Sequence, residues 1–272
     1  MRIDLHLHTT CSDGNYPPQK VIELAVDNEL EVISITDHDT DAAYDLIDKA
    51  KVGNISIIHG VEITANHEGN EVHVLGYFRN GTSDRLRDFL KRLQDERVGR
   101  ISESIRNLEK HNVKLNYDDL AKFSKGESIG RNHLASLLVE NGFADTVKKS
   151  FELFLRKDMN IVPQLLTPVK EAIEIIRSND GVAVWAHPPQ RFFDDYLNIF
   201  RGYGLQGIEA FNYRKTTSTS NYYTDTAKKL NLFVTAGSDW HGFENEDFPG
   251  KLYYKESVTD KFVSHMLESR KP

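Results

Sequence analysis

Seven short apolar runs rich in β-branched residues recur along this chain, and helical patterns separate most of them. In order, the runs are Ile3–Leu7, Val32–Thr36, Ile55–Ile63, Val72–Phe78, Val182–Ala186, Gly207–Phe211 and Leu232–Thr235. Such runs predict strands, and strands that alternate with helices predict a parallel α/β arrangement. The segments expected to be helical include Pro18–Asn28, Asp41–Lys51, Pro168–Ser178 and Ser220–Leu230. The 272 residues suit an α/β barrel with an addition.

The interval from residue 79 to residue 162 breaks this alternation, because it reads as consecutive helices without a strand between them. Its first helix carries an apolar stripe at helical spacing, formed by Leu86, Leu90, Leu93, Ile101, Ile105 and Leu108. We therefore expect residues 1–78 and 163–272 to form a metal-binding barrel. Residues 79–162 are expected to form a helical insertion or cap domain.

The composition excludes several classes of protein. The formal net charge of -7 provides no global basic field for nucleic acid or an anionic membrane, although residues 79–114 carry ten Lys/Arg against six Asp/Glu. No apolar stretch approaches the roughly 20 residues that span a bilayer, and the N-terminus does not resemble a signal peptide. The single cysteine, Cys11, excludes an internal disulfide. These features predict a cytoplasmic protein.

Six of the eleven histidines lie at or just beyond the ends of predicted strands, beside acidic residues. His6 and His8 alternate with leucines, so both imidazoles share one strand face. Glu62 interrupts an apolar run, where a carboxylate is costly unless a cation lies nearby. The candidate metal ligands are His6, His8, Asp13, His38, Glu62, His73, His187, Asp239 and His241. Mixed imidazole and carboxylate donors suit zinc, iron or manganese and disfavour calcium.

The phrases that carry these residues resemble those of the polymerase and histidinol phosphatase (PHP) family. They are Asp4-Leu5-His6-Leu7-His8, Ser12-Asp13-Gly14, Thr36-Asp37-His38-Asp39, Gly60-Val61-Glu62, His73-Val74-Leu75-Gly76-Tyr77, Ala186-His187-Pro188 and Ser238-Asp239-Trp240-His241-Gly242. The resemblance spans nearly the whole chain. It implies a distorted seven-stranded (β/α) barrel with a trinuclear metal site that hydrolyses phosphate esters. It points to the stand-alone branch of nucleoside 3′,5′-bisphosphate phosphatases and 5′-3′ exoribonucleases.

The resemblance also implies which residues hold each ion. One ion would be held by His6, His8, Glu62 and Asp239. Glu62 would bridge to a second ion that is bound by His73 and His187. A third ion would be held by Asp13, His38 and His241. Three divalent ions against three carboxylates leave about +3, which attracts a phosphate despite the acidic surface. A metal-bound hydroxide would then attack the phosphorus, because the ions lower the pKa of water toward ~7.

Ser128-Ile129-Gly130-Arg131-Asn132-His133-Leu134-Ala135 is similar to a Gly-Arg-Pro-His-x-Ala segment of that branch, with Asn132 in place of the proline. By this resemblance Arg131 would grip a phosphoryl oxygen, and His133 would bind phosphate or protonate the leaving oxygen. A helix salt bridge and a helix cap are the alternatives. Arg97 and Arg100 would reach a second phosphate if the insertion covers the barrel mouth, and surface charge is the alternative.

The expected function is that of a metal-dependent phosphoesterase acting on a nucleotide, such as a 3′,5′-bisphosphate or a nucleoside monophosphate. A 5′-3′ exoribonuclease acting on short RNA ends is the near alternative. An amidohydrolase or deaminase and a noncatalytic metal-binding domain are more distant ones. The expected cofactors are three divalent ions, zinc, iron or manganese. The expected partner is a phosphorylated small molecule, without a membrane or an obligate protein partner.

Overall fold

The computed structural model describes residues 1–123, 126, 128–212, 215–243 and 259–268. Eight strands in these ranges form two sheets, one ordered β1-β2-β3 and the other β4-β5-β6-β7-β8. The first sheet contains β1 (Ile3–Leu7), β2 (Val32–Ile35) and β3 (Ser56–Ile57). The second contains β4 (His59–His67), β5 (Asn70–Phe78), β6 (Val182–Trp185), β7 (Gly207–Phe211) and β8 (Phe233–Ala236).

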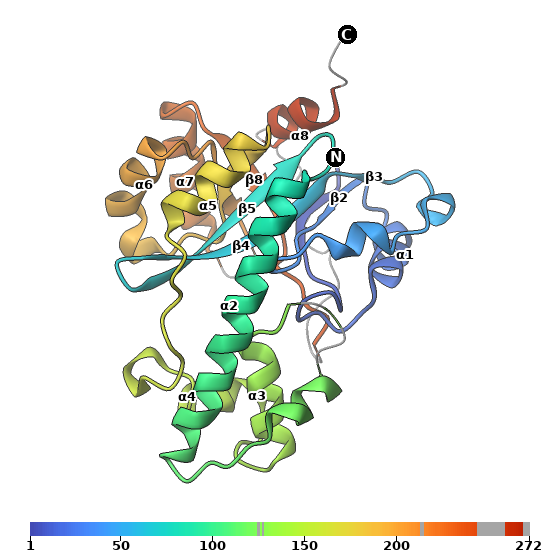
Figure 1. Ribbon diagram of the computed structural model, residues 1–272. Helices are drawn as coiled ribbons and strands as arrows, with labels where there is room; N and C mark the ends of the chain where they lie inside the picture. Colours follow the sequence, from blue (N-terminus) through green and yellow to red (C-terminus); the bar gives the residue numbers. More distant parts are fainter. Residues whose placement is uncertain (124–125, 127, 213–214, 244–258, 269–272) are drawn as a thin grey trace.

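The helices of the described residues are α1 (Pro18–Asp27), α2 (Asp84–Glu109), α3 (Arg131–Glu140), α4 (Val147–Leu153), α5 (Val169–Ser178), α6 (Phe193–Gly202), α7 (Thr217–Lys229) and α8 (Asp260–Leu267). Figure 1 shows α5, α6 and α7 beside the five-stranded sheet and α1 beside the three-stranded sheet. Within the described ranges, none of the helices combines the length and the apolar composition that a membrane crossing requires.

The strand pairing differs from the parallel arrangement expected from the sequence. β4 pairs antiparallel with β5, and β5 pairs antiparallel with β6, whereas β6, β7 and β8 are parallel. The cause is local. His67 pairs directly with Asn70, and the two residues between them, Glu68 and Gly69, have φ values of 50° and 72°. Two positive φ values are typical of a two-residue hairpin turn, which joins β4 to β5 without a crossover helix.

The predicted seven-stranded barrel is not confirmed, because the eight strands form two sheets and neither is closed. The run predicted over residues 55–63 divides into β3, which pairs with β2, and β4, which pairs with β5. Isolated bridges join the two sheets: Leu7 of β1 pairs with Trp240, which follows β8, and His38, which follows the central strand β2, pairs with Glu62 of β4. The structure therefore establishes a mixed α/β fold.

The helix predicted over residues 41–51 is wrong. Two short 3-10 helices stand in its place, Ala42–Asp45 and Lys49–Lys51. The hydroxyl of Tyr44 donates to the carbonyl of Ile35 at 2.6 Å and accepts the N–H of Gly60 at 2.7 Å. These contacts hold the segment against β2 and β4, because tertiary bonds outweigh the weak preference of single residues for an α-helix.

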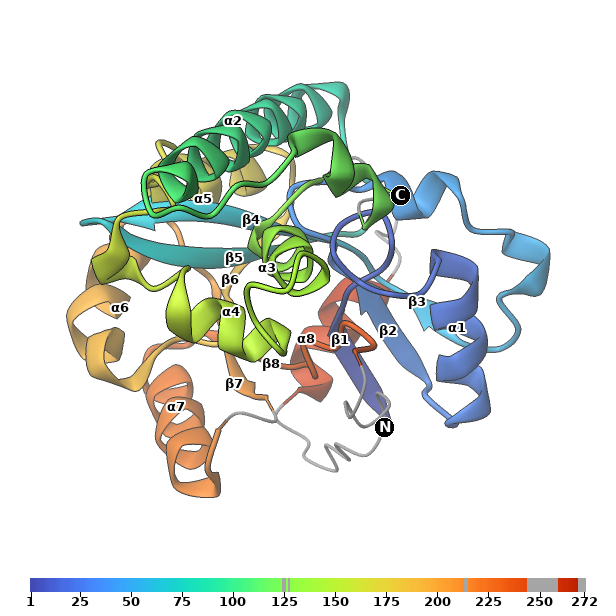
Figure 2. The ribbon, with the colours of Figure 1, turned by 90° about the horizontal axis from the view of Figure 1, so that it is seen from below.

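Helix α2 links the sheets to a helical end of the molecule. Leu86 and Leu90 from its first half are buried in a cluster with side chains of β4, β5 and α5. Ile101 and Leu108 from its second half are buried with side chains of α3. Figures 1 and 2 show α3 and α4 beneath the sheets, at the end remote from the start of β1. As predicted, the described part of residues 79–162 contains helices and no strand.

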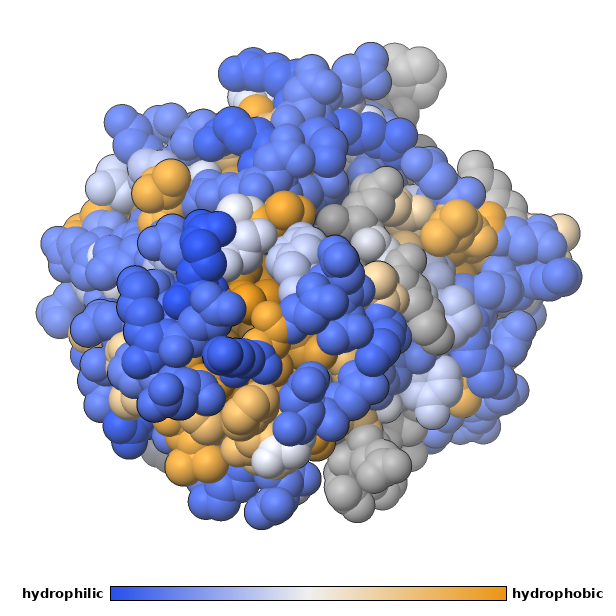
Figure 3. Space-filling model, turned by 60° about the horizontal axis from the view of Figure 1, so that its bottom comes forward, coloured by the Kyte–Doolittle hydropathy of each residue, from blue (hydrophilic) through white to orange (hydrophobic). Residues whose placement is uncertain are grey.

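The surface of this helical end is mainly hydrophilic. Figure 3 turns it forward and shows apolar atoms gathered near its middle, surrounded by hydrophilic side chains. Partly buried aromatic side chains of this end include Phe143, Phe151 and Phe154, which pack against the same cluster as Ile101 and Leu108. The helical end therefore has an apolar core of its own.

Candidate metal centre

The nine predicted metal ligands come from both sheets and lie together in one cluster. His6 is in β1, Glu62 in β4 and His73 in β5. The others lie in the segments that follow strands, and they are His8, Asp13, His38, His187, Asp239 and His241. Donor atoms lie within 4.8 Å of one another in three overlapping groups: His8, Asp13, His38 and His241; His6, His8, Glu62 and Asp239; and His38, Glu62 and His73.

Glu62 is central to the cluster. Its Oε1 lies 2.9 Å from Nδ1 of His73 and 3.1 Å from Nε2 of His187. Its Oε2 lies 3.3 Å from Nε2 of His6 and 3.3 Å from Nε2 of His8. Two ligands of one tetrahedral zinc ion lie roughly 3.3 Å apart, since each is about 2.0–2.1 Å from the ion. Oε2 also lies 3.0 Å from Nδ1 of His38. Glu62 therefore presents one oxygen to two imidazoles and the other to three, an arrangement in which its two oxygens could serve different ions.

The two aspartates complete the cluster. Oδ1 of Asp13 lies 3.4 Å from Nε2 of His241, and its Oδ2 lies 3.9 Å from Nε2 of His38. Oδ1 of Asp239 lies 3.2 Å from Nε2 of His8. Each of the nine residues thus has a donor atom within 4.0 Å of a donor atom of another. The predicted ligands converge although they are spread from residue 6 to residue 241.

Several buried nitrogen and oxygen atoms of this cluster, all of a kind that binds metal ions, make no hydrogen bond. They are His6 Nε2, His8 Nδ1, Asp13 Oδ1, His38 Nδ1 and Glu62 Oε2. Most buried polar atoms in proteins are satisfied, so a group of unsatisfied ones needs an explanation. A cation would satisfy them, and imidazole nitrogen with carboxylate oxygen is a donor set that suits zinc, iron or manganese. The residues therefore fit divalent metal ions.

The carboxylates of the cluster are ionised, whereas its imidazoles differ in their protonation. Burial by itself raises the pKa of Glu62, but the charges of His6 and His38 hold that pKa well below its usual value. Burial likewise opposes ionisation of Asp13, and His241 lowers its pKa well below the usual value. Burial lowers the pKa of His8 to about 3. At pH 7 the two carboxylates are therefore ionised and His8 is neutral, whereas the nearby carboxylates raise the pKa of His73 to about 10 and that of His241 to about 9. Metal ions would displace the protons of those two rings on binding.

Glu209 supports the cluster and was not predicted from the sequence. It is fully buried in β7, and its Oε1 lies 2.9 Å from Nδ1 of His6. Its Oε2 accepts the backbone N–H of His187 at 2.8 Å. A carboxylate that holds the second ring nitrogen of a metal-binding histidine fixes the orientation of the ring. The sequence did indicate such a role, because Glu209 is an acidic residue inside the apolar run Gly207–Phe211, just as Glu62 is an acidic residue inside its own apolar run.

Asp37 holds the turn that carries Asp13. Its carboxylate accepts the N–H of Thr9 at 2.7 Å, the hydroxyl of Thr9 at 2.6 Å and the hydroxyl of Ser12 at 2.5 Å. Side chains that bond to a neighbouring turn restrict its conformation. Asp37 was noted in the sequence only as a neighbour of His38, and the contact with Thr9 and Ser12 depends on the tertiary fold.

Two of the candidate ligands have a left-handed backbone. The φ of His187 is 30° and that of Asp239 is 57°. Such conformations cost about 1–3 kcal/mol each in residues other than glycine, and they gather at functional sites. Here the surroundings hold them, because Glu209 binds the N–H of His187 and the carbonyl of His6 accepts the N–H of Asp239 at 2.9 Å.

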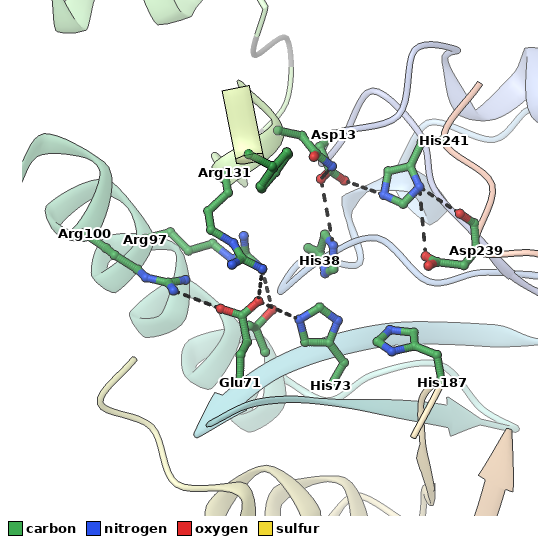
Figure 4. Close-up of a pocket in the computed structure, with 13 residues that line it drawn as sticks. Asp13, His38, Glu71, His73, Arg97, Arg100, Arg131, His187, Asp239 and His241 are labelled. Atoms are coloured by element: carbon green, nitrogen blue, oxygen red, sulfur yellow. Dashed lines mark hydrogen bonds and ion pairs between the residues drawn. The ribbon is translucent and has the colours of Figure 1, made fainter. Parts of the chain in front are cut away.

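A cavity of about 420 Å³ lies beside the cluster. Figure 4 shows the histidines and aspartates on one side of it and three arginines on the other. Glu71 lies between the two sides, with Oε1 accepting from Nη2 of Arg131 at 2.6 Å and Oε2 accepting from Nη2 of Arg100 at 2.9 Å. Arg97 also lines the cavity, and it is buried with an ion pair to Asp39. Arg97 is therefore a buried, ion-paired residue, and the alternative expected for it, a charge on the surface, is wrong.

The two predicted catalytic residues lie in different surroundings. Arg131 lines the large cavity, whereas His133 lines a neighbouring cavity of about 150 Å³. Nδ1 of His133 accepts the N–H of Gly130 at 2.9 Å, so the ring caps α3, which was the alternative expected for it. Burial lowers the pKa of His133. Its role in proton transfer stays a prediction.

A mixed α/β fold with buried imidazoles and carboxylates beside an arginine-lined cavity defines a metal-dependent hydrolase of anionic substrates. Residues 4–161 match the PHP domain, which is more than half of the chain, so the chain belongs to the PHP family. A solved structure described as a putative metal-dependent phosphoesterase from Bifidobacterium adolescentis has the same fold, with a TM-score of 0.83 and 28% identity. The similarity covers 97% of this chain and 95% of that one. The protein is an enzyme, a metal-dependent phosphoesterase.

Two relatives describe the chemistry of the family more closely. A 5′-3′ exoribonuclease from Salmonella typhimurium is 29% identical over 248 residues, which are 88% of this chain and 84% of the relative. A 3′,5′-nucleoside bisphosphate phosphatase from Chromobacterium violaceum is 26% identical over 247 residues, 88% of this chain and 87% of the relative. Both names refer to nucleotide or RNA substrates, and they differ in the substrate itself.

Proposed function

We propose that this enzyme hydrolyses a phosphomonoester of a nucleotide, such as a 3′,5′-bisphosphate or a nucleoside monophosphate, at a site with three divalent metal ions. The observation that carries this proposal is the cavity, which has six of the nine clustered donors on one side and three arginines on the other. A substrate with two phosphates uses both sides, because arginine forks bind phosphate oxygens well. The names of the two relatives support this class of substrate.

The proposed ligands of the ions are those expected from the sequence. The first ion takes His6, His8, Glu62 and Asp239. The second takes Glu62, His73 and His187, and the third takes Asp13, His38 and His241. When bound, zinc, iron or manganese ions supply positive charge to phosphoryl oxygens and lower the pKa of water. Glu209 supports the first set by fixing the ring of His6, and Asp37 supports the third by fixing the turn of Asp13.

The arginines have a separate task in this proposal. Arg131 binds a phosphoryl oxygen, and to do so its guanidinium exchanges Glu71 for the substrate. Phe151 lines the same cavity, with its ring 5.8 Å from the guanidinium carbon of Arg131. An aromatic ring at this place offers a stacking surface for a nucleobase. Arg131 and Phe151 together therefore favour a nucleotide over a small aliphatic phosphate.

We also propose the two-unit division expected from the sequence. One apolar cluster is formed by buried side chains from Ile101 to Ile161, all within residues 79–162, which supports a separate cap unit. Residues 1–78 and 163–272 would form the other unit. The two isolated bridges between the sheets, Leu7 with Trp240 and His38 with Glu62, support a distorted barrel there.

A 5′-3′ exoribonuclease acting on short RNA ends is the second candidate. It is favoured by the cationic wall of the cavity, which suits more than one phosphate of a chain, and by the Salmonella typhimurium relative. An amidohydrolase remains a distant alternative. Elemental analysis distinguishes an amidohydrolase from a phosphoesterase. Nine ligands imply close to three metal ions for each chain, whereas a content near one ion favours amide chemistry.

The test is a screen of purified protein with added manganese, iron or zinc, which measures released phosphate and, for the RNAs, released nucleoside monophosphate as well. The substrates are nucleoside monophosphates, nucleoside 3′,5′-bisphosphates, histidinol phosphate and short 5′-phosphorylated RNAs. We expect turnover of nucleotides, and we expect Asp239→Ala and His187→Ala to abolish it while the circular dichroism spectrum is retained. His111→Ala is the matched control, because His111 is exposed and lies outside the cluster. Unchanged turnover in Asp239→Ala would refute the proposed site.

A further inference from the structure

Asn132 joins the helical end of the molecule to the donor cluster. It is the second residue of α3, and Nδ2 of its amide donates to Oδ2 of Asp13 at 2.7 Å. An ionised carboxylate only accepts hydrogen bonds, so the amide must present its nitrogen to Asp13. Asn132 and Asp13 both line the cavity of about 420 Å³ and the neighbouring cavity of about 150 Å³. The bond therefore links α3 to a candidate metal ligand at a wall that the two cavities share.

The two oxygens of Asp13 have different surroundings. Oδ2 carries the bond from Asn132, whereas Oδ1 is buried and makes no hydrogen bond. Oδ1 lies 3.4 Å from Nε2 of His241 and 3.8 Å from Nδ1 of His8. The distance to His241 is close to the roughly 3.3 Å between two ligands of one zinc ion, each about 2.0–2.1 Å from that ion. Oδ1 is therefore the oxygen that is available to an ion.

The fold holds Asn132 firmly in place. Nδ1 of His133 accepts the N–H of Gly130 at 2.9 Å, which fixes the start of α3. Leu134 and Leu137 of the same helix are fully buried in an apolar cluster that also contains side chains of α2. A donor on a packed helix is placed more precisely than a donor on a loop. The amide can therefore restrict the carboxylate of Asp13.

The contact depends on the residue that this chain has at position 132. The similar Gly-Arg-Pro-His-x-Ala segment has a proline there, and the proline ring has no side-chain donor. Asp37 fixes the turn of Asp13 through Thr9 and Ser12, but it does not hold the carboxylate itself. Asn132 supplies that second constraint.

We propose that Asn132 is a positioning residue for the third metal ion, the one assigned to Asp13, His38 and His241. Its amide holds Oδ2 of Asp13 and so directs Oδ1 at the ion. This inference rests on the proposed function, because it requires the site with three ions. A side chain that orients a ligand in this way contributes to metal affinity without touching the ion. Asp13 is not a proposed ligand of the other two ions, so their binding should not depend on Asn132.

The test measures metal binding to Asn132→Ala, and it does not depend on turnover. Manganese is titrated into metal-free protein in competition with a fluorescent chelator, which gives the number of bound ions and the affinity of each. We expect one of the three ions to bind about 10- to 100-fold more weakly, the usual effect of losing such a partner. The other two ions should bind within twofold of the unaltered protein.

Asn107→Ala is the matched control. Asn107 is also a partly buried asparagine of the helical end, and its Nδ2 donates to the carbonyl of Ile161 at 3.0 Å. Ile161 belongs to the apolar cluster of that end, so this variant loses a similar hydrogen bond elsewhere. We expect Asn107→Ala to bind all three ions like the unaltered protein. Equal metal binding in Asn107→Ala and Asn132→Ala would overturn the positioning role.

Hydrogen–deuterium exchange tests the same link from the side of the helix. In the unaltered protein, saturation with manganese should slow exchange of the amides of α3, because the ion, Asp13 and Asn132 form one chain of contacts. In Asn132→Ala this slowing should be lost even when manganese fills every site. A general loss of stability would speed exchange but would keep the response to manganese. Slowing of equal size in both proteins would count against the inference.

The variant Asp13→Ala separates failure of this inference from failure of the proposed function. It removes a proposed ligand, so we expect it to lose the third ion. If Asp13→Ala loses an ion and Asn132→Ala does not bind it more weakly, the three-ion site stands and the positioning role is refuted. If Asp13→Ala loses no ion, the three-ion site fails and the inference fails with it. If both variants weaken one ion but no substrate is hydrolysed, the positioning role stands and the proposed activity fails.

Discussion

Glu62 and Glu209 are both fully buried, and their partners separate their roles. A buried carboxylate is costly unless it is paired or hydrogen-bonded. Both oxygens of Glu209 have a partner, the ring of His6 and the N–H of His187. Oε2 of Glu62 lies near imidazole nitrogens without making a hydrogen bond. Glu62 is therefore suited to a cation, and Glu209 is suited to orienting the ring of His6.

The role of Glu209 gives a prediction for one side chain. Glu209→Gln keeps the shape but loses the charge that orients His6, so we expect metal affinity to fall 10- to 100-fold, as is usual for such partners. Competition with a fluorescent chelator measures it. Glu174→Gln is the control, because Glu174 is more than half exposed and belongs to a surface pair with Lys170. Equal metal affinity in the two variants would contradict the orienting role.

At the scale of elements, Asp41 joins the start of α2 to the loop after β2. The hydroxyl of Thr82 donates to Oδ2 of Asp41, and Nε of Arg87 donates to the same oxygen at 3.1 Å. Nε2 of His59 in β4 lies 3.4 Å from that oxygen. Three segments therefore meet at one carboxylate, which positions the N-terminal end of α2 against the sheets.

This contact predicts a pH dependence of stability. Burial alone raises the pKa of Asp41, but its bonds to His59 and Thr82 and the charge of Arg87 bring it below the usual value. A carboxylate whose pKa is lower in the folded state contributes stability above its unfolded pKa of about 3.9, and loses it as the pH falls through the folded pKa. Asp41→Asn should therefore be less stable than the unaltered protein at pH 7, and the difference should shrink below about pH 4.

Urea denaturation at pH 7 and pH 3 measures this difference. Asp45→Asn is the control, because Asp45 pairs with the same Arg87 at 3.4 Å but is well exposed. We expect Asp45→Asn to change the free energy of unfolding by less than 1 kcal/mol, as for exposed pairs in general. A stability difference for Asp41→Asn that stays constant from pH 7 to pH 3 would show that the carboxylate charge is not the cause.

At the scale of the whole molecule, the donor cluster joins elements that the backbone ladders leave in separate sheets. His6 belongs to the three-stranded sheet, and Glu62 and His73 belong to the five-stranded one. Metal ions that bind these side chains bind the folded chain and not the unfolded one. Metal binding should therefore stabilise the whole fold, because a ligand that prefers the folded state shifts the unfolding equilibrium.

This coupling predicts a fall of the melting temperature on chelation. Ions at 100 times their dissociation constant contribute about 2.7 kcal/mol, and at roughly 2–4 °C for each kcal/mol the melting temperature should fall by about 5–10 °C. Differential scanning calorimetry with manganese and then with EDTA measures the fall. Asp239→Ala, which removes a proposed ligand, should show a much smaller one. A melting temperature that does not respond to chelation would mean that the ions do not bridge the two sheets.

The sequence by itself predicted the metal-ligand candidates and the α/β class. Local rules suffice for both, since strand side chains alternate with a period of two and ligand-bearing phrases stand just after apolar runs. For this reason His6 and His8 share a strand face, and Glu62 stands out in the sequence as an acidic residue inside an apolar run. The helical character of residues 79–162 follows from the same kind of pattern.

Only the tertiary structure decided how these parts meet. The antiparallel pairing of β5 with β6 joins segments about a hundred residues apart, and no local pattern distinguishes it from a parallel pair. Glu71 became the partner of Arg100 and Arg131, and Arg97 became a buried residue, because α2 and α3 lie across the strand ends. The physical reason is that burial, ion pairing and cavity walls depend on contacts between distant segments, whereas propensity and periodicity describe neighbours in the chain.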